Sequence, residues 1–175
     1  MTVAGALPRR EPAALRAGTE RVFDTVGRNR VLARCHFQRE RARPCLLLIP
    51  GLVGDLSSPY VVGTAEKGYA RGFHVVRVNA RNCGETEALA ADSYHGGTTE
   101  DVLAVASELA RVGVPRVYLV GFSLGGSMAL KLAGELGSEA PPWLAGVAVL
   151  SPCLDFGAAA ERMNADAFGR LCQRR

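Results

Sequence analysis

The pentapeptide Gly121-Phe122-Ser123-Leu124-Gly125, with the pattern G-x-S-x-G, has the clearest chemical potential in this chain. It follows the apolar, β-branched stretch 116–120 and precedes residues 126–133, which have helical character. A serine on a tight turn between a strand and a helix is a nucleophile elbow, in which a strained backbone exposes the hydroxyl group. The helix N-terminus behind it favours developing negative charge. Ser123 is therefore predicted to be a nucleophile for acyl transfer, although similar residues also occur at ordinary strand-to-helix turns.

Acyl transfer also needs hydrogen-bond donors that hold the oxyanion of the tetrahedral intermediate. In this architecture one donor is the backbone N–H of the residue after the nucleophile, and the second comes from the loop after the third strand. These positions are Leu124 and Leu52. Gly51 lets the backbone of that loop approach closely. The alternative interpretation of the Leu52 loop is an ordinary connection between a strand and a helix.

The proton acceptor is the missing part. A serine triad on this architecture runs Ser, then Asp or Glu, then His, yet His36, His74 and His95 all precede Ser123. His36 and His74 fall inside expected strands and are interpreted as structural. His95 lies in a loop at the sheet edge where the elbow opens. It is either a substitute base or, as we favour, a residue whose hydrogen bond holds the loop.

Asp155 follows the strand expected at 144–150 and is a candidate for the triad acid. A triad acid orients a histidine, and no histidine follows Asp155, so this role has little support. We expect Asp155 to form a turn or cap before a helical stretch that begins at Ala158.

Periodicity places the elements that position these residues. Strands are expected in a hairpin over 20–38 and at 45–49, 73–78, 116–120 and 144–150. Helices are expected from a Ser58-Pro59 start to before Gly72, from a capping box of Thr98 with Asp101 to Gly113, and from the elbow to about Gly137. Alternating strands and helices predict the α/β class, with a mostly parallel sheet and helices on both faces.

Composition narrows the functional classes. The chain has 175 residues, 48% of them hydrophobic and 22% charged, as in an ordinary globular protein. Residues 1–44 carry ten arginines against four acidic residues, but little aromatic interleaving, so no nucleic-acid partner is expected. No stretch is long enough to span a membrane, and no secretory signal is recognisable. The five cysteines show no metal-ligand spacing and are expected to be reduced and mostly buried, as in a cytoplasmic protein.

Several motifs occur in an order that carries a family resemblance. They are Gly51-Leu52 with Gly54, Ser57-Ser58-Pro59-Tyr60, Asn79-Ala80-Arg81-Asn82-Cys83-Gly84, Tyr94-His95-Gly96-Gly97, Thr99-Glu100-Asp101 and the elbow with Gly126. Together they resemble the AB hydrolase 4 family of the α/β-hydrolase superfamily over about residues 40–155. Two departures are Pro50, where the family often has His, and Ser127, where it often has Asn.

The resemblance implies a serine hydrolase of carboxylic esters, acting on short- to medium-chain acyl esters or lipids, with Ser123 as nucleophile and no metal or organic cofactor. It also implies that the acid and histidine lie on later strands, so this chain is expected to be inactive alone. The alternatives are a non-catalytic pseudo-enzyme or binding protein, and an alcohol acyltransferase. We expect a flexible leader at 1–19, the N-terminal part of a hydrolase domain at 20–155, and the start of a cap region or a truncated tail at 156–175. The sheet would be incomplete at its C-terminal edge, which favours oligomers or aggregation.

Overall fold

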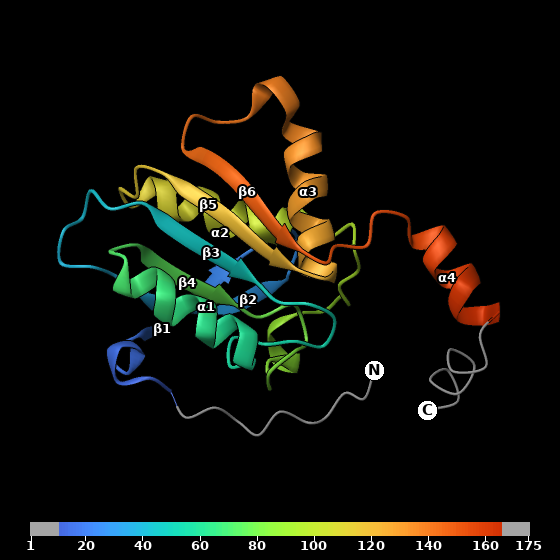
Figure 1. The fold of residues 1–175 in the computed structure, drawn as a ribbon, viewed down its shortest axis with the longest axis horizontal. Helices are drawn as coiled ribbons and strands as arrows, with labels where there is room; N and C mark the ends of the chain where they lie inside the picture. The colour runs from blue at the N-terminus through green and yellow to red at the C-terminus, as the bar shows by residue number, and fades with distance from the viewer. Residues whose placement is uncertain (1–10, 166–175) are drawn as a thin grey trace.

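A computed structural model describes residues 11–165. Its six-stranded sheet has the order β1-β2-β4-β3-β5-β6 (Figure 1). The strands are β1 (Thr19–Asp24), β2 (Arg30–His36), β3 (Cys45–Ile49), β4 (His74–Val78), β5 (Val117–Phe122) and β6 (Leu144–Leu150). The helices are α1 (Pro59–Ala70), α2 (Glu100–Arg111), α3 (Leu124–Leu136) and α4 (Phe156–Ala165), with short 3-10 turns η1 (Ala13–Leu15), η2 (Glu87–Leu89) and η3 (Gly137–Glu139).

The sheet is mixed and mostly parallel, as the sequence predicts. β4, β3, β5 and β6 run parallel to one another. β1 and β2 form the expected antiparallel hairpin, and β2 is also antiparallel to β4. The carboxyl ends of the parallel strands therefore meet at one edge of the sheet, where the loops after β3, β4, β5 and β6 come together.

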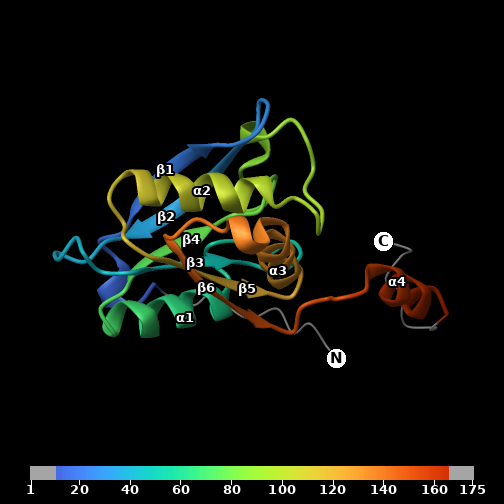
Figure 2. The ribbon, with the colours of Figure 1, turned by 90° about the horizontal axis from the view of Figure 1, so that it is seen from above.

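Helices cover both faces of the sheet, also as predicted. Figure 2 shows α1 on one side and α2 with α3 on the other. The continuous apolar run of β3 is buried on both faces, because Leu47 belongs to the core under α2 and α3 and Leu48 to the core under α1. This burial places β3, and the loop that follows it, at the centre of the molecule.

The expectation of a flexible leader through residue 19 is wrong for its described part, residues 11–19. Leu15, in η1, is fully buried in the core beneath α1. Glu11 forms an ion pair with Arg77, a fully buried side chain on β4. Because a buried guanidinium needs a counter-charge, this segment has a structural role. Residues 1–10 lie outside the described residues.

The neighbours of Arg77 complete this buried network. One guanidinium nitrogen, Nη1, donates to the carbonyl oxygen of Leu56 at 2.8 Å, and Nη2 lies 3.1 Å from His36 Nε2. Burial and the positive charge of Arg77 lower the pKa of His36 to about 4. His36 is thus neutral near pH 7, and its Nε2 accepts a hydrogen bond from Arg77.

The two predicted helix starts differ in outcome. Ser58 is the N-cap of α1 with Pro59 in its first turn, as expected. The capping box of Thr98 with Asp101 is wrong, because α2 begins at Glu100 and its N-cap is Thr99. The Asp101 carboxylate instead accepts two hydrogen bonds from Arg81, a buried side chain of the loop after β4. The need to pair that buried cation outweighs a local cap.

The predicted state of the cysteines holds for the part of the chain that the structure describes. Cys35, Cys45, Cys83 and Cys153 are free thiols, and all but Cys153 are buried. Cys172 lies outside the described residues.

β6 forms one end of the sheet. Among residues 11–165, no strand pairs with its outer edge. Apolar side chains are exposed along and beyond it, with Leu150 51%, Phe156 47% and Leu154 81% accessible. Helix α4 extends away from the sheet at this end of the molecule (Figure 1). An open strand edge beside exposed apolar groups favours pairing with another chain.

We therefore predict that the 175-residue chain self-associates. Light scattering after size-exclusion chromatography should give a mass above that of the monomer. Ala145→Lys, which adds a charge at an exposed position of β6, should shift the protein toward the monomer. Ala91→Lys adds the same charge at an exposed position near the hairpin, at the other end of the sheet, and should not. A wild-type chain that stays monomeric at high concentration would contradict the prediction.

Candidate active site

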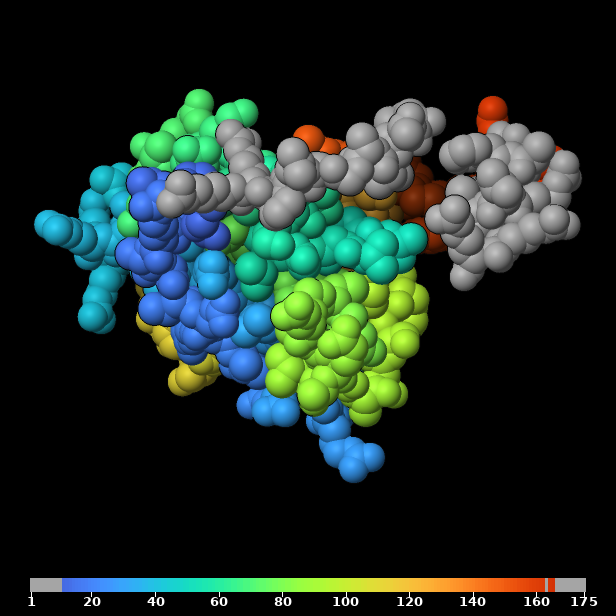
Figure 3. Space-filling model, turned by 90° about the horizontal axis from the view of Figure 1, so that it is seen from below, coloured from blue at the N-terminus to red at the C-terminus, as the bar shows by residue number. Residues whose placement is uncertain are grey.

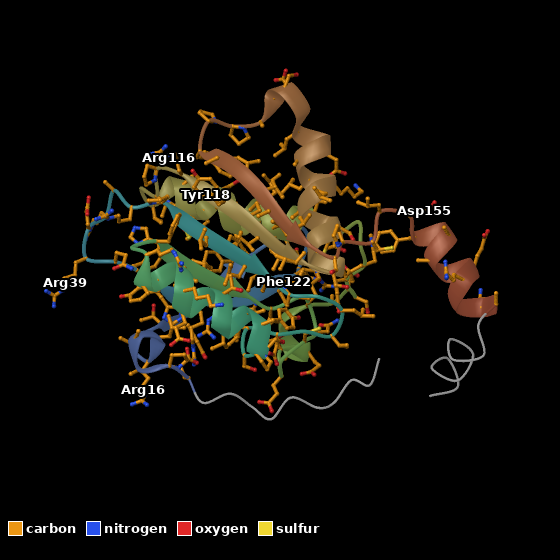
Figure 4. The ribbon with its side chains drawn as sticks, in the orientation of Figure 1. Arg16, Arg39, Arg116, Tyr118, Phe122 and Asp155 are labelled. Atoms are coloured by element: carbon orange, nitrogen blue, oxygen red, sulfur yellow. The ribbon has the colours of Figure 1, made fainter. Side chains whose placement is uncertain are left out.

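Ser123 stands on the turn between β5 and α3, as the elbow pattern predicts. Its backbone has φ 48° and ψ −118°, a strained conformation for a residue with a side chain. Its N–H donates to the Leu150 carbonyl oxygen of β6 at 2.9 Å, which ties the turn to the neighbouring strand. The residue is exposed at the carboxyl edge of the sheet, directly after the buried Phe122, which Figure 4 labels at the end of β5.

Two glycines allow this turn to form. A Cβ on Gly121 would lie 2.4 Å from the Gly125 carbonyl oxygen, and a Cβ on Gly125 would lie 2.2 Å from the Pro50 carbonyl oxygen. The Ile49 carbonyl oxygen would be only 2.5 Å from the Gly125 Cβ. The first turn of α3 thus rests directly on the end of β3. Any side chain at either position would force backbone groups apart.

The loop after β3 passes beside the elbow. A Cβ on Gly51 would lie 3.1 Å from the Ser123 Cβ. A cleft of about 360 Å³ opens here, lined by Gly51, Leu52, Tyr60, Phe122, Ser123, Leu150 and Ser151. Leu52, one of the two expected oxyanion donors, lines the same cleft as Ser123, and Leu124, the other, is the first residue of α3. Among residues 11–165, no acceptor is assigned to the N–H of Leu52 or of Leu124. Their oxyanion role remains a prediction.

His95 and Asp155 each make a local hydrogen bond that gives the residue a structural role. His95 is exposed, and its Nδ1 accepts the N–H of Gly97 at 3.0 Å within its own turn. That contact is the loop-holding hydrogen bond that we favoured. The Oδ1 atom of Asp155 (Figure 4) accepts the N–H of Ala158 at 2.9 Å, so Asp155 caps α4 as expected, although the helix begins at Phe156 and not at Ala158. His36 and His74 are both buried in strands. The His74 Nδ1 accepts the N–H of Gln38 at 2.9 Å.

Sequence reasoning missed three residues that brace the site. The Ser127 hydroxyl donates to the Cys153 carbonyl oxygen at 2.8 Å and accepts the Cys153 N–H, which ties the loop after β6 to α3. The hydroxyls of Tyr60 and Tyr94 contact the loop after β3. All three occur within or beside motifs that carry the family resemblance, but only the tertiary contacts assign them these partners.

In the described part of the chain, no group of three or more His, Cys, Asp or Glu side chains could hold a metal ion. Within the same residues, none of the helices has both the length and the apolar character that a membrane crossing requires.

The sequence is similar to a known protein family and to several known proteins. The family described as "alpha/beta hydrolase fold" matches residues 44–171. "Embryogenesis-associated protein EMB8" of Picea glauca is 30% identical over 99 residues, which are 56% of this chain and 22% of that protein. The Escherichia coli protein named "Putative esterase YheT" is 35% identical over 100 residues, 57% of this chain and 29% of its own. Mouse "Phospholipase ABHD3" is 30% identical over 100 residues, 57% of this chain and 24% of its own.

Solved structures show the same fold. The Pyrococcus furiosus esterase Pf2001 superimposes with a TM-score of 0.70 at 16% identity, over 86% of this chain and 57% of that one. The match to the curated relatives spans only 22% to 29% of their length. The family match, the sheet order and the elbow together show that this chain belongs to the α/β-hydrolase superfamily. Relatives named as an esterase and a phospholipase agree with a hydrolase family.

The contact between α3 and β3 predicts opposite effects for two glycine substitutions in one helix. Gly125→Ala should destabilise the fold by about 3 kcal/mol or more, because its Cβ would meet backbone oxygens that cannot move independently. Gly134→Ala meets nothing within 4 Å and should stabilise it by about 0.5–1 kcal/mol through helix propensity. Urea unfolding of the two variants measures both. A Gly125→Ala variant as stable as the wild type would contradict the close contact.

Proposed function

We propose that this chain carries the nucleophile and oxyanion hole of a serine hydrolase that acts on carboxylic esters, with short- to medium-chain acyl esters or lipids as substrates. The observation that carries the proposal is the strained, exposed Ser123 on the elbow, beside the loop of Leu52. Residues in strained backbone conformations persist where the surrounding structure enforces them, and they are frequent at active sites.

The proposed reaction has two steps. The Ser123 oxygen attacks the carbonyl carbon of the ester, its proton passes to a base, and the negative charge on the carbonyl oxygen is held by the N–H groups of Leu52 and Leu124. The bond to the leaving alcohol then breaks, and the alcohol takes the proton from the base. Water attacks the acyl-serine in the same way and releases the carboxylic acid. An alcohol in place of water would give the acyltransferase alternative.

The proposed reaction needs a base that accepts the Ser123 proton. Among the 175 residues, no histidine follows Ser123. The Nδ1 of His95 accepts the N–H of Gly97, so the proton of the neutral ring is on Nε2, and neither ring nitrogen is free to take the proton of Ser123. The proton acceptor of the proposed reaction is therefore a group outside these residues. A chain without that group corresponds to the non-catalytic alternative.

A cysteine at the elbow tests the nucleophile without a base, since a thiol ionises near neutral pH by itself. Ser123→Cys should release one equivalent of p-nitrophenol from p-nitrophenyl butyrate in a burst, as the thiolate displaces the phenolate and forms a thioester. Ser151→Cys places a thiol in the same cleft, away from the elbow. Each oxyanion donor contributes about 10²–10³-fold, so the burst should be at least tenfold faster in Ser123→Cys.

The wild-type chain is the blank for its own cysteines in this experiment. Equal acylation rates for Ser123→Cys and Ser151→Cys would show that the elbow offers no catalytic advantage. That result would remove Ser123 and the two amides from the proposed mechanism.

The wild-type chain alone should hydrolyse p-nitrophenyl butyrate barely above the buffer rate, and Ser123→Ala should change little. A neutral alcohol is a poor nucleophile, and an oxyanion hole without a triad retains only about 10³–10⁴-fold of the acceleration. Steady-state hydrolysis measured at several enzyme concentrations checks this. Robust turnover that disappears in Ser123→Ala would contradict it, and loss of that turnover in His95→Ala would identify His95 as the base.

A further inference from the structure

The backbone of the loop after β3 is held along nearly its whole length. The N–H groups of residues 53–58 all donate hydrogen bonds. Their acceptors are the Tyr94 hydroxyl, the Gly51 carbonyl, the Ser58 hydroxyl, the Asn79 amide oxygen, the Asp55 carboxylate and the Asp55 carbonyl, in chain order. The N–H of Gly51 donates to the Tyr60 hydroxyl at 3.1 Å. Within the described residues, Leu52 alone in the range 51–58 has an N–H without an acceptor.

The amides on either side of Leu52 are thus held by two tyrosine hydroxyls. Tyr60 lies in the first turn of α1, and its ring also packs on Phe122 with ring centroids 4.8 Å apart. Phe122 immediately precedes Ser123, so one side chain contacts both the Leu52 loop and the elbow. A Cβ on Gly54 would lie only 2.5 Å from the Tyr60 hydroxyl oxygen, which shows that the loop closes tightly around it.

Tyr94 holds the other side of Leu52. Its hydroxyl accepts the N–H of Val53 at 2.6 Å, from the loop between β4 and α2. In Figure 3 this yellow-green loop lies against the teal segment that follows β3. Burial raises the pKa of Tyr94 against the opposing effect of the hydrogen bond from Val53, so the hydroxyl is neutral at pH 7.

Val53 has a strained backbone within the turn that the Gly54 N–H closes on the Gly51 carbonyl oxygen at 3.0 Å. Its φ of 51° lies in the left-handed region, which a β-branched residue strongly disfavours. Its side chain is 80% exposed, so packing of that side chain does not enforce the conformation. The backbone contacts of the loop therefore hold it, namely the Gly51–Gly54 turn together with the hydrogen bond from the Val53 N–H to Tyr94.

We propose that Tyr60 and Tyr94 are positioning residues that clamp the amides of Gly51 and Val53 and thereby leave the Leu52 N–H as the free donor of this loop. The proposal rests on the proposed function, in which that amide holds the oxyanion. Tyr60 also lines the cleft of Ser123, but in this proposal both tyrosines act through the backbone of the loop and not on the reacting atoms. Their hydroxyls set the direction of a backbone group, and removal of either hydroxyl would release one side of the clamp.

The test uses two reactions of the Ser123→Cys chain. Acylation by p-nitrophenyl butyrate passes through an oxyanion, whereas alkylation by iodoacetamide does not. Tyr60→Phe and Tyr94→Phe, each added to Ser123→Cys, should lower the acylation rate at least tenfold while the alkylation rate changes less than twofold. Gly54→Ala, whose Cβ crowds the Tyr60 hydroxyl, should have the same selective effect. Tyr118→Phe is the matched control and should change neither rate, because Tyr118 lies on β5 (Figure 4) and does not line the cleft.

Each outcome separates the two proposals. If Ser123→Cys acylates rapidly and both phenylalanine variants keep the ratio of acylation to alkylation within twofold, the clamp is refuted and the proposed function stands. If acylation and alkylation fall together, or the thermal transition is lost, the tyrosines only stabilise the fold and the clamp is likewise refuted. If Ser123→Cys acylates no faster than Ser151→Cys, the proposed function itself fails.

Discussion

The close contact between the first turn of α3 and the end of β3 is the constraint on which the rest of the site depends. Gly125 lies against the carbonyl oxygens of Ile49 and Pro50 with no room for a side chain. This backbone-to-backbone packing fixes the height of Ser123 above the sheet. It also fixes the distance between the elbow and the loop that begins at Gly51. Two segments that are about seventy residues apart in sequence thus behave as one rigid unit.

A buried charged side chain also supports the loop after β3, in addition to Tyr60 and Tyr94. Arg77 on β4 is fully buried and donates to the carbonyl oxygen of Leu56, at the far end of the loop. Glu11 supplies the counter-charge, while the Nε atom of Arg77 has no partner among the described residues. Burying a cation in this way costs solvation free energy, and the ion pair and hydrogen bonds offset it. The N-terminal segment therefore contributes to the loop through one charged side chain.

Local patterns in the sequence were sufficient for much of this structure. The apolar run of β3, the β1–β2 hairpin and the elbow between β5 and α3 each have a signature within about ten residues, and each forms as predicted. The burial of Leu15 and the ion pair of Glu11 were missed because they depend on partners far away in the chain. The capping box at Thr98 failed for the same reason, since Arg81 binds the carboxylate of Asp101. The positions of Ser123 and Leu52 in one cleft agree with the sequence pattern, whereas their chemical roles require kinetic evidence.

In the loop after β3, the backbone and the side chains have different roles. Beyond the loop itself, its amides donate to three side chains, Tyr60, Tyr94 and Asn79, yet the side chains of Leu52 and Val53 are 67% and 80% exposed. Mutation at these two positions is therefore inexpensive for the fold, while the Leu52 side chain borders the cleft beside Ser123. Related proteins with this loop can therefore change their substrate preference at these side chains while the backbone groups beside Ser123 stay in place. The rim of the cleft is thus where substitutions, in natural evolution or in a directed-evolution library, should cost the least stability.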